Sequence, residues 1–129
     1  MPKHFQPSLD ALFRITLASI LIFNVCNYVF SWLPFPEMPI KAGQFIQAIV
    51  SVGYLFPLIK TIEAVVAVFL LINRYLVLAM VLWLPILINY TLFHWFLAPQ
   101  WQSVSVFLSV VSMGIMAIRK QDFIMAFKR

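Results

Sequence analysis

The strongest constraint on this chain of 129 residues is its succession of long apolar stretches, separated by short polar or proline-containing segments. Apolar side chains make up 64% of the sequence and charged ones 10%, whereas soluble domains have roughly half apolar and about a quarter charged residues. Such a chain can neither remain disordered nor fold as a water-soluble globule. Because one helical span takes about 20 apolar residues, about four spans fit. The sequence therefore predicts an all-α fold, an integral membrane four-helix bundle that forms a single domain over residues 1–129.

The boundaries of the spans follow from capping residues, prolines and charges. We expect spans at about residues 9–33, 56–72, 75–97 and 103–118. Ser8 is the expected N-cap of the first span, and Pro34, Pro36 and Pro39 follow its end. Pro85 lies inside the third span, where neighbouring helices can satisfy the carbonyl that it frees, so a kink is expected there rather than a break.

A shorter helix is expected before the second span, at about residues 42–52. Gln44, Gln47 and Ser51 follow a helical spacing that collects polar groups on one stripe. The segment is too short to cross a bilayer, so it is predicted to be an interfacial or re-entrant helix. Gly53 and Pro57 separate it from the second span.

The positions of the charged residues predict the orientation of the chain. Lys41 is the only basic residue of the first connection. The other basic residues outside the second span lie at the termini or at the connection of spans two and three: Lys3, Arg14, Arg74, Arg119, Lys120, Lys128 and Arg129. By the positive-inside rule both termini are cytoplasmic, residues 119–129 form a cytoplasmic tail, and Arg14 reaches the inner boundary alone along its methylene stem. The lipid bilayer accounts for the basic charge, so a nucleic-acid partner is not needed.

Six polar side chains are expected at similar depths in the outer half of the membrane. They are Asn24, Asn27, Lys60, Glu63, Asn89 and His94. Lys60 and Glu63 are three residues apart and share a helix face, and each alone would cost about 2.5 to 3.5 kcal/mol near the centre of a span. We therefore expect the pair to face the bundle interior, below a polar cavity that opens on the outer side and binds a ligand.

A structural role stays open for each of these features. Lys60 and Glu63 are equally consistent with an ion pair that fixes helix register, the asparagines with bridges between helices, and His94 with a residue at the wet boundary. Ser105, Ser109 and Ser112 follow a stripe typical of close helix packing.

The sequence offers few means of covalent or metal chemistry. Met113 and Met116 are expected in the core, because no cysteine or histidine has a spacing that would complete a metal site with them. Cys26 is the only cysteine, which excludes a disulfide within the chain. No covalently bound cofactor is expected, and any redox role would need a lipid-soluble carrier or a partner subunit.

Three segments together resemble a known family. The loop FPEMP, the run GYLFPLIKTIEAVVAVFLLINRY and the later run LWLPILINYTLFHWF resemble the DoxX family of small four-span bacterial membrane proteins, over roughly residues 24–97. The matching positions are Lys60, Glu63, Asn73, Arg74, Pro85, Asn89 and His94. Ala67 departs from the pattern, because the family usually has a glycine after the glutamate. The resemblance implies the bacterial inner membrane and a membrane subunit of an oxidoreductase assembly.

These observations lead to one functional expectation and two alternatives. We expect a quinone or a similar lipophilic molecule in the outer cavity, with Asn89 and His94 at its carbonyl oxygens, Lys60 near developing negative charge and Glu63 holding Lys60 or moving a proton. The first alternative is a non-catalytic scaffold or interaction subunit, which can include a homo-oligomer. The second, a small transporter, is disfavoured because the chain lacks an internal repeat and paired broken helices. No catalytic residue is assigned.

Overall fold

The described part of the chain, residues 7–128 of a computed structural model, is helical over most of its length and contains no strand. Two terminal residues used above for orientation, Lys3 and Arg129, lie outside it. Its helices are α1 (Pro7–Phe30), α2 (Ile40–Val52), α3 (Leu55–Ile72), α4 (Leu76–Phe96), the 3-10 turn η1 (Pro99–Trp101), α5 (Gln102–Ile118) and α6 (Lys120–Phe127). The predicted all-α class is confirmed.

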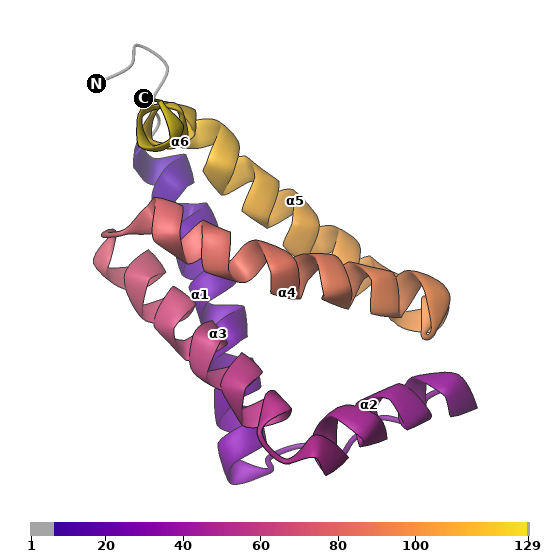
Figure 1. Cartoon of the computed structure of the whole chain (residues 1–129). Helices are drawn as coiled ribbons and strands as arrows, with labels where there is room; N and C mark the ends of the chain where they lie inside the picture. The colour runs from indigo at the N-terminus through magenta and orange to yellow at the C-terminus, as the bar shows by residue number, and fades with distance from the viewer. Residues whose placement is uncertain (1–6, 129) are drawn as a thin grey trace.

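Four helical stretches are long and apolar enough to cross a membrane: α1, α3, α4, and η1 together with α5. They form a bundle in which α1 packs against α3 and α5, and α4 packs against the same two helices (Figure 1). The chain is therefore a multi-pass membrane protein with the predicted number of spans. The starts of α1 and α6 lie at the same end of the bundle, as an even number of spans requires.

The core is built from apolar side chains of all four spans. Leu17 and Leu21 of α1 meet Val66 and Leu70 of α3 in one buried cluster, which also includes residues of α4 and α5. Most other large apolar side chains are exposed, as expected when lipid rather than water surrounds the helices. Trp83 of α4 is an exception among the tryptophans, because it is 1% exposed and its Nε1 donates a hydrogen bond to Ser112 Oγ at 2.9 Å.

The first span ends earlier than predicted. Helix α1 stops at Phe30, because Ser31 has a positive φ of 51° and the chain then becomes extended through the proline-rich segment. Asn27 Oδ1 accepts a hydrogen bond from the Leu33 backbone N–H at 2.8 Å, which fixes this exit. Ser8 lies inside the helix, after Pro7, so the predicted N-cap at Ser8 is wrong.

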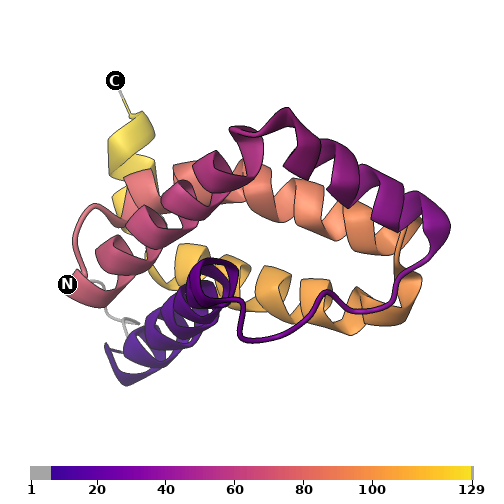
Figure 2. The same cartoon turned by 90° about the horizontal axis from the view of Figure 1, so that it is seen from below.

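The short helix expected before the second span is present as α2, two residues longer at its start than predicted. Figure 2 shows the segment between α1 and α2 crossing beneath the bundle before α2 begins. Helix α2 packs against α3, and its Phe45 ring lies 5.6 Å from that of Phe93 in α4. Gly53, with φ of 91°, ends α2 in a conformation that an L side chain rarely adopts.

The tight connection between α3 and α4 makes these helices an antiparallel hairpin. Asn73 closes α3 in the left-handed conformation, and both its N–H and that of Arg74 donate to the Phe69 carbonyl. Tyr75 is also left-handed, with φ of 58°, so two of the three connecting residues reverse the chain. Helix α4 then continues through Pro85 without interruption.

Candidate functional site

The centre of the candidate site is an ion pair on α3. Lys60 Nζ lies 3.2 Å from Glu63 Oε2, and their side chains are 16% and 7% exposed. The expectation that these two residues share a face and contact each other is therefore confirmed. Both charged groups are largely buried, and their mutual attraction offsets part of the free energy that burial of the charges costs.

Lys60 also contacts an aromatic ring. Lys60 Nζ is 5.3 Å from the centre of the Phe56 ring, a distance at which a cation is attracted to an aromatic face. Phe56 in turn contacts Tyr28 of α1, with ring centres 5.2 Å apart. The ammonium group thus contacts the Glu63 carboxylate and the Phe56 ring, and Tyr28 of α1 packs against that ring.

Tyr90 and His94 extend the polar group from α3 to α4. Glu63 and Tyr90 are close enough to interact electrostatically. The Tyr90 and His94 rings meet edge to face with centres 4.5 Å apart, one helical turn from each other. We call Lys60, Glu63, Tyr90 and His94 the polar cluster. Tyr90 is not among the site residues that the sequence predicts, because its proximity to Glu63 depends on how α3 and α4 pack together.

His94 carries the unsatisfied group of the polar cluster. The residue is 7% exposed, and Nδ1 is buried without a hydrogen-bond partner. The backbone of Ala98 is near enough for a weak hydrogen bond with the imidazole, but no hydrogen bond of good geometry reaches Nδ1. A buried polar atom left without a partner costs about 1 to 3 kcal/mol. Such an atom in a native fold needs an explanation, and a ligand or a bound water is one.

The three asparagines do not join the polar cluster through hydrogen bonds within residues 7–128. Asn24 is half-buried on α1, and Asn27 is used locally at the exit of α1. Asn89 is exposed and lies on a different side of α4 from His94, and its expected contact with a ligand stays a prediction. The reason is helical geometry, because residues five apart on a helix point about 140° from each other.

A second group of charges, which the sequence interpretation missed, lies at the opposite end of the bundle. Asp10 is 1% exposed and accepts hydrogen bonds from Arg14 Nε at 2.8 Å and from Arg119 Nε and Nη2 at 2.9 and 2.8 Å. Arg119 Nη2 also donates to Asn73 Oδ1 at 2.7 Å. We call Asp10, Arg14, Asn73 and Arg119 the junction cluster, because it joins α1, the α3–α4 turn and the α5–α6 turn.

Arg14 corrects another expectation. It is 8% exposed and is not a lone cation at the membrane boundary, since it pairs with Asp10 and donates from Nη1 to the Leu70 carbonyl at 2.7 Å. That carbonyl belongs to the last turn of α3, where helical partners are missing. The i, i+4 spacing of Asp10 and Arg14 was the available signal for this pair.

The junction cluster is built for structure rather than for chemistry. Its hydrogen bonds are short and connect groups already satisfied within the protein, and the hydrogen bond to Asp10 raises the pKa of Arg119 above the ordinary arginine value. A guanidinium that remains protonated cannot exchange protons near neutral pH. Among residues 7–128 no group of three His, Cys, Asp or Glu side chains is placed to hold a metal ion.

Comparison with known proteins adds no relative to this geometry. No family model, no curated protein and no solved structure matches the chain. The polar cluster therefore has to be interpreted from its own side chains.

Proposed function

We propose that this chain is a DoxX-like membrane subunit of an oxidoreductase assembly, and that it binds a quinone or a similar lipophilic molecule at the polar cluster. The observation that carries the proposal is the buried Nδ1 of His94, which makes no hydrogen bond of good geometry, on a ring that contacts Tyr90, the residue that interacts with Glu63 of the Lys60–Glu63 pair. In this proposal the membrane is the bacterial inner membrane. The termini are cytoplasmic, because the exposed residues Arg74, Lys120 and Lys128 lie at the end of the bundle where α1 begins and α6 lies.

The side chains of the polar cluster suit a ligand with carbonyl oxygens. A quinone presents two carbonyl oxygens at an apolar ring and accepts two electrons, here from a partner oxidoreductase subunit, together with two protons. The Tyr90 hydroxyl and a protonated His94 nitrogen can donate hydrogen bonds to a carbonyl oxygen. The Lys60 ammonium can stabilise negative charge on such an oxygen, while Glu63 orients Lys60 or moves a proton. Phe56 and Phe93 supply aromatic surfaces beside them.

The competing function is a scaffold in which buried charges fix helix register. This function requires charges that connect different helices, as Asp10 and Arg119 do across 109 sequence positions. Lys60 and Glu63 are both on α3 and three residues apart, so their bond constrains one helix only. The geometry therefore favours register fixing for the junction cluster and a ligand for the polar cluster.

Leucine substitutions test the proposal. We expect Lys60→Leu with Glu63→Leu to fold and to lose quinone binding, measured by titration of the purified protein with a soluble short-chain quinone. Each single substitution should be less stable than the double variant, by about 3 to 5 kcal/mol, because it leaves one buried charge uncompensated. Lys41→Gln, at an exposed position of α2, is the control and should bind as the unmodified chain does.

His94→Phe gives an independent measurement, since it removes the partnerless nitrogen and retains a ring of similar shape. We expect unchanged or higher thermal stability with at least tenfold weaker quinone binding. If the double leucine variant and His94→Phe both bind quinone as the unmodified chain does, the polar cluster is structural and the scaffold function replaces our proposal.

A further inference from the structure

A groove lies far from the polar cluster, at the end of the bundle that carries the junction cluster. Its volume is about 600 Å³. Its lining comes from the α3–α4 turn, the first turns of α4, the α5–α6 turn and α6. The lining is mostly apolar and includes Leu78, Val81, Ala126 and Phe127, while Asn73, Arg119 and Asp122 provide polar groups at one end. We call it the α4–α6 groove.

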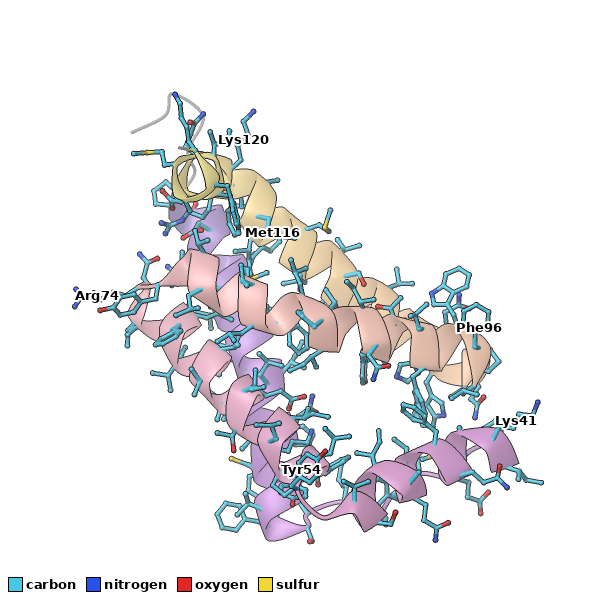
Figure 3. All side chains as sticks on the ribbon, in the orientation of Figure 1. Lys41, Tyr54, Arg74, Phe96, Met116 and Lys120 are labelled. Atoms are coloured by element: carbon cyan, nitrogen blue, oxygen red, sulfur yellow. The ribbon has the colours of Figure 1, made fainter. Side chains whose placement is uncertain are left out.

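Basic side chains outnumber acidic ones around this groove. Arg74, Lys120 and Lys128 are exposed and are chain neighbours of the lining residues Asn73, Arg119 and Phe127. Within residues 7–128 these three cations make no ion pair. The carboxylate of Asp122 at the groove is 3.5 Å from Arg119 Nη1, which partly neutralises it. Figure 3 shows Arg74 and Lys120 at the end of the molecule opposite to Lys41 and Tyr54.

The groove also continues a surface that faces lipid. Val81 and Leu78 are 44% and 48% exposed on α4, a helix long and apolar enough to span the membrane. Phe127 is 72% exposed on α6, beside Lys128. The apolar groove can hold an acyl chain, and the basic residues beside it can attract an anionic headgroup.

We propose that the α4–α6 groove binds one anionic phospholipid of the leaflet at this end of the bundle. Its acyl chain lies between α4 and α6 against Val81 and Phe127, and its phosphate lies near Arg74, Lys120 and Lys128. Zwitterionic lipid fills the apolar part equally well but gains less from the three cations. This site is independent of the quinone site, because the two clusters lie at opposite ends of the bundle.

Native mass spectrometry of the full chain tests the proposal. The protein is released from nanodiscs that contain equal amounts of phosphatidylglycerol and phosphatidylcholine, and the retained lipid is identified. We expect one retained phosphatidylglycerol and a clear preference over phosphatidylcholine. Lys120→Gln with Lys128→Gln, both at exposed positions, should reduce that preference about 25-fold, since each basic residue near an anionic surface contributes about fivefold. Lys41→Gln removes a cation at the other end and should leave the preference unchanged.

A second substitution tests the groove itself. Val81→Trp fills the channel and should abolish retention of phosphatidylglycerol, whereas Val68→Trp, at a valine of α3 that is 53% exposed against 44% for Val81, should not. Far-UV circular dichroism and size exclusion identify any variant that fails to fold, and the two lysine substitutions then carry the test. Equal retention of the two lipids by the unmodified chain overturns the proposal. So does displacement of the lipid by millimolar glycerol phosphate, which would show a headgroup site without a channel.

Discussion

Arg119 holds Asp10 with two parallel hydrogen bonds, from Nε to Oδ1 at 2.9 Å and from Nη2 to Oδ2 at 2.8 Å. This fork geometry joins the first turns of α1 to the junction of α5 and α6, across 109 positions of sequence. Arg14 contacts the same carboxylate, so one buried anion serves two arginines. Loss of the anion therefore leaves both cations without their main partner.

Asp10→Asn tests this dependence. We expect the free energy of unfolding to fall by about 3 to 5 kcal/mol, because the amide keeps the shape of the carboxylate and removes its charge next to two arginines. Thermal unfolding in detergent measures the change. Asp122→Asn is the control, since Asp122 is half exposed and its contact with Arg119 is long at 3.5 Å, and we expect it to change stability by less than about 1 kcal/mol. Equal effects of the two substitutions would contradict a special role of Asp10.

The pH dependence of this contact follows from the raised pKa of Arg119. A cation whose pKa is higher in the folded state contributes stability that is fully present below its unfolded pKa and is lost only as the pH rises through the folded value. For arginine that window lies far above neutrality. We expect the difference in melting temperature between the unmodified chain and Arg119→Gln to stay constant between about pH 7 and about pH 9. A difference that shrinks over this range would show that another group controls the contact.

Asn73 combines two roles that substitutions can separate. It adopts the left-handed conformation at the end of α3, and its Oδ1 accepts a hydrogen bond from Arg119 at 2.7 Å. Asn73→Gly keeps the backbone conformation and loses the hydrogen bond, whereas Asn73→Ala loses the bond and strains the turn by a further 1 kcal/mol or so. We expect melting temperatures in the order unmodified, Asn73→Gly, Asn73→Ala. The reverse order of the two variants would show that the turn does not depend on the left-handed residue.

Hydropathy and helical spacing predicted most of the fold and the centre of the candidate site. Four spans, the short helix before the second and the Lys60–Glu63 contact all arise from local patterns, either a long apolar run or a spacing of three residues. The contact between Asp10 and Arg119 could not be predicted in the same way. It depends on how distant helix ends meet, and a charge at the end of a span has the same pattern whether it faces solvent, lipid or a partner.

The asparagines show a different limit. The sequence places Asn24, Asn27 and Asn89 at a similar depth, because depth follows from position along each helix. Which way a side chain points depends on the rotation of the helix about its axis. That rotation is set by packing of residues such as Trp83 and Leu87 against the other spans, which leaves Asn89 exposed. Depth alone therefore cannot assign a residue to a site.

The hydrogen bond between Trp83 and Ser112 gives the next prediction. Ser112 accepts from Trp83 Nε1 and itself donates to the Leu108 carbonyl at 2.7 Å, so its hydroxyl is fully used. Ser112→Ala leaves the buried indole N–H without an acceptor, and we expect a loss of about 1 to 3 kcal/mol together with a shift in tryptophan fluorescence. Ser103→Ala, at an exposed serine of the same helix, is the matched control and should alter neither.

Helices α1 and α5 approach each other closely at Gly114. A Cβ atom added there would lie 2.6 and 2.8 Å from two ring carbons of Phe13, distances that native side chains do not show. Because the Phe13 ring packs against the core cluster, it can move only by disturbing its neighbours. We expect Gly114→Val to destabilise the bundle by about 1 to 3 kcal/mol, measured as a lower melting temperature in detergent. Gly43→Ala is the control, because its nearest neighbour is Met38 Cγ at 3.9 Å, an ordinary contact, and alanine favours a helix.

A double variant, Gly114→Val with Phe13→Ala, should regain part of the loss, since the smaller side chain vacates the space that valine needs. If the loss of stability in the double variant equals the sum of the losses in Gly114→Val and Phe13→Ala, the two residues do not limit the approach of α1 and α5.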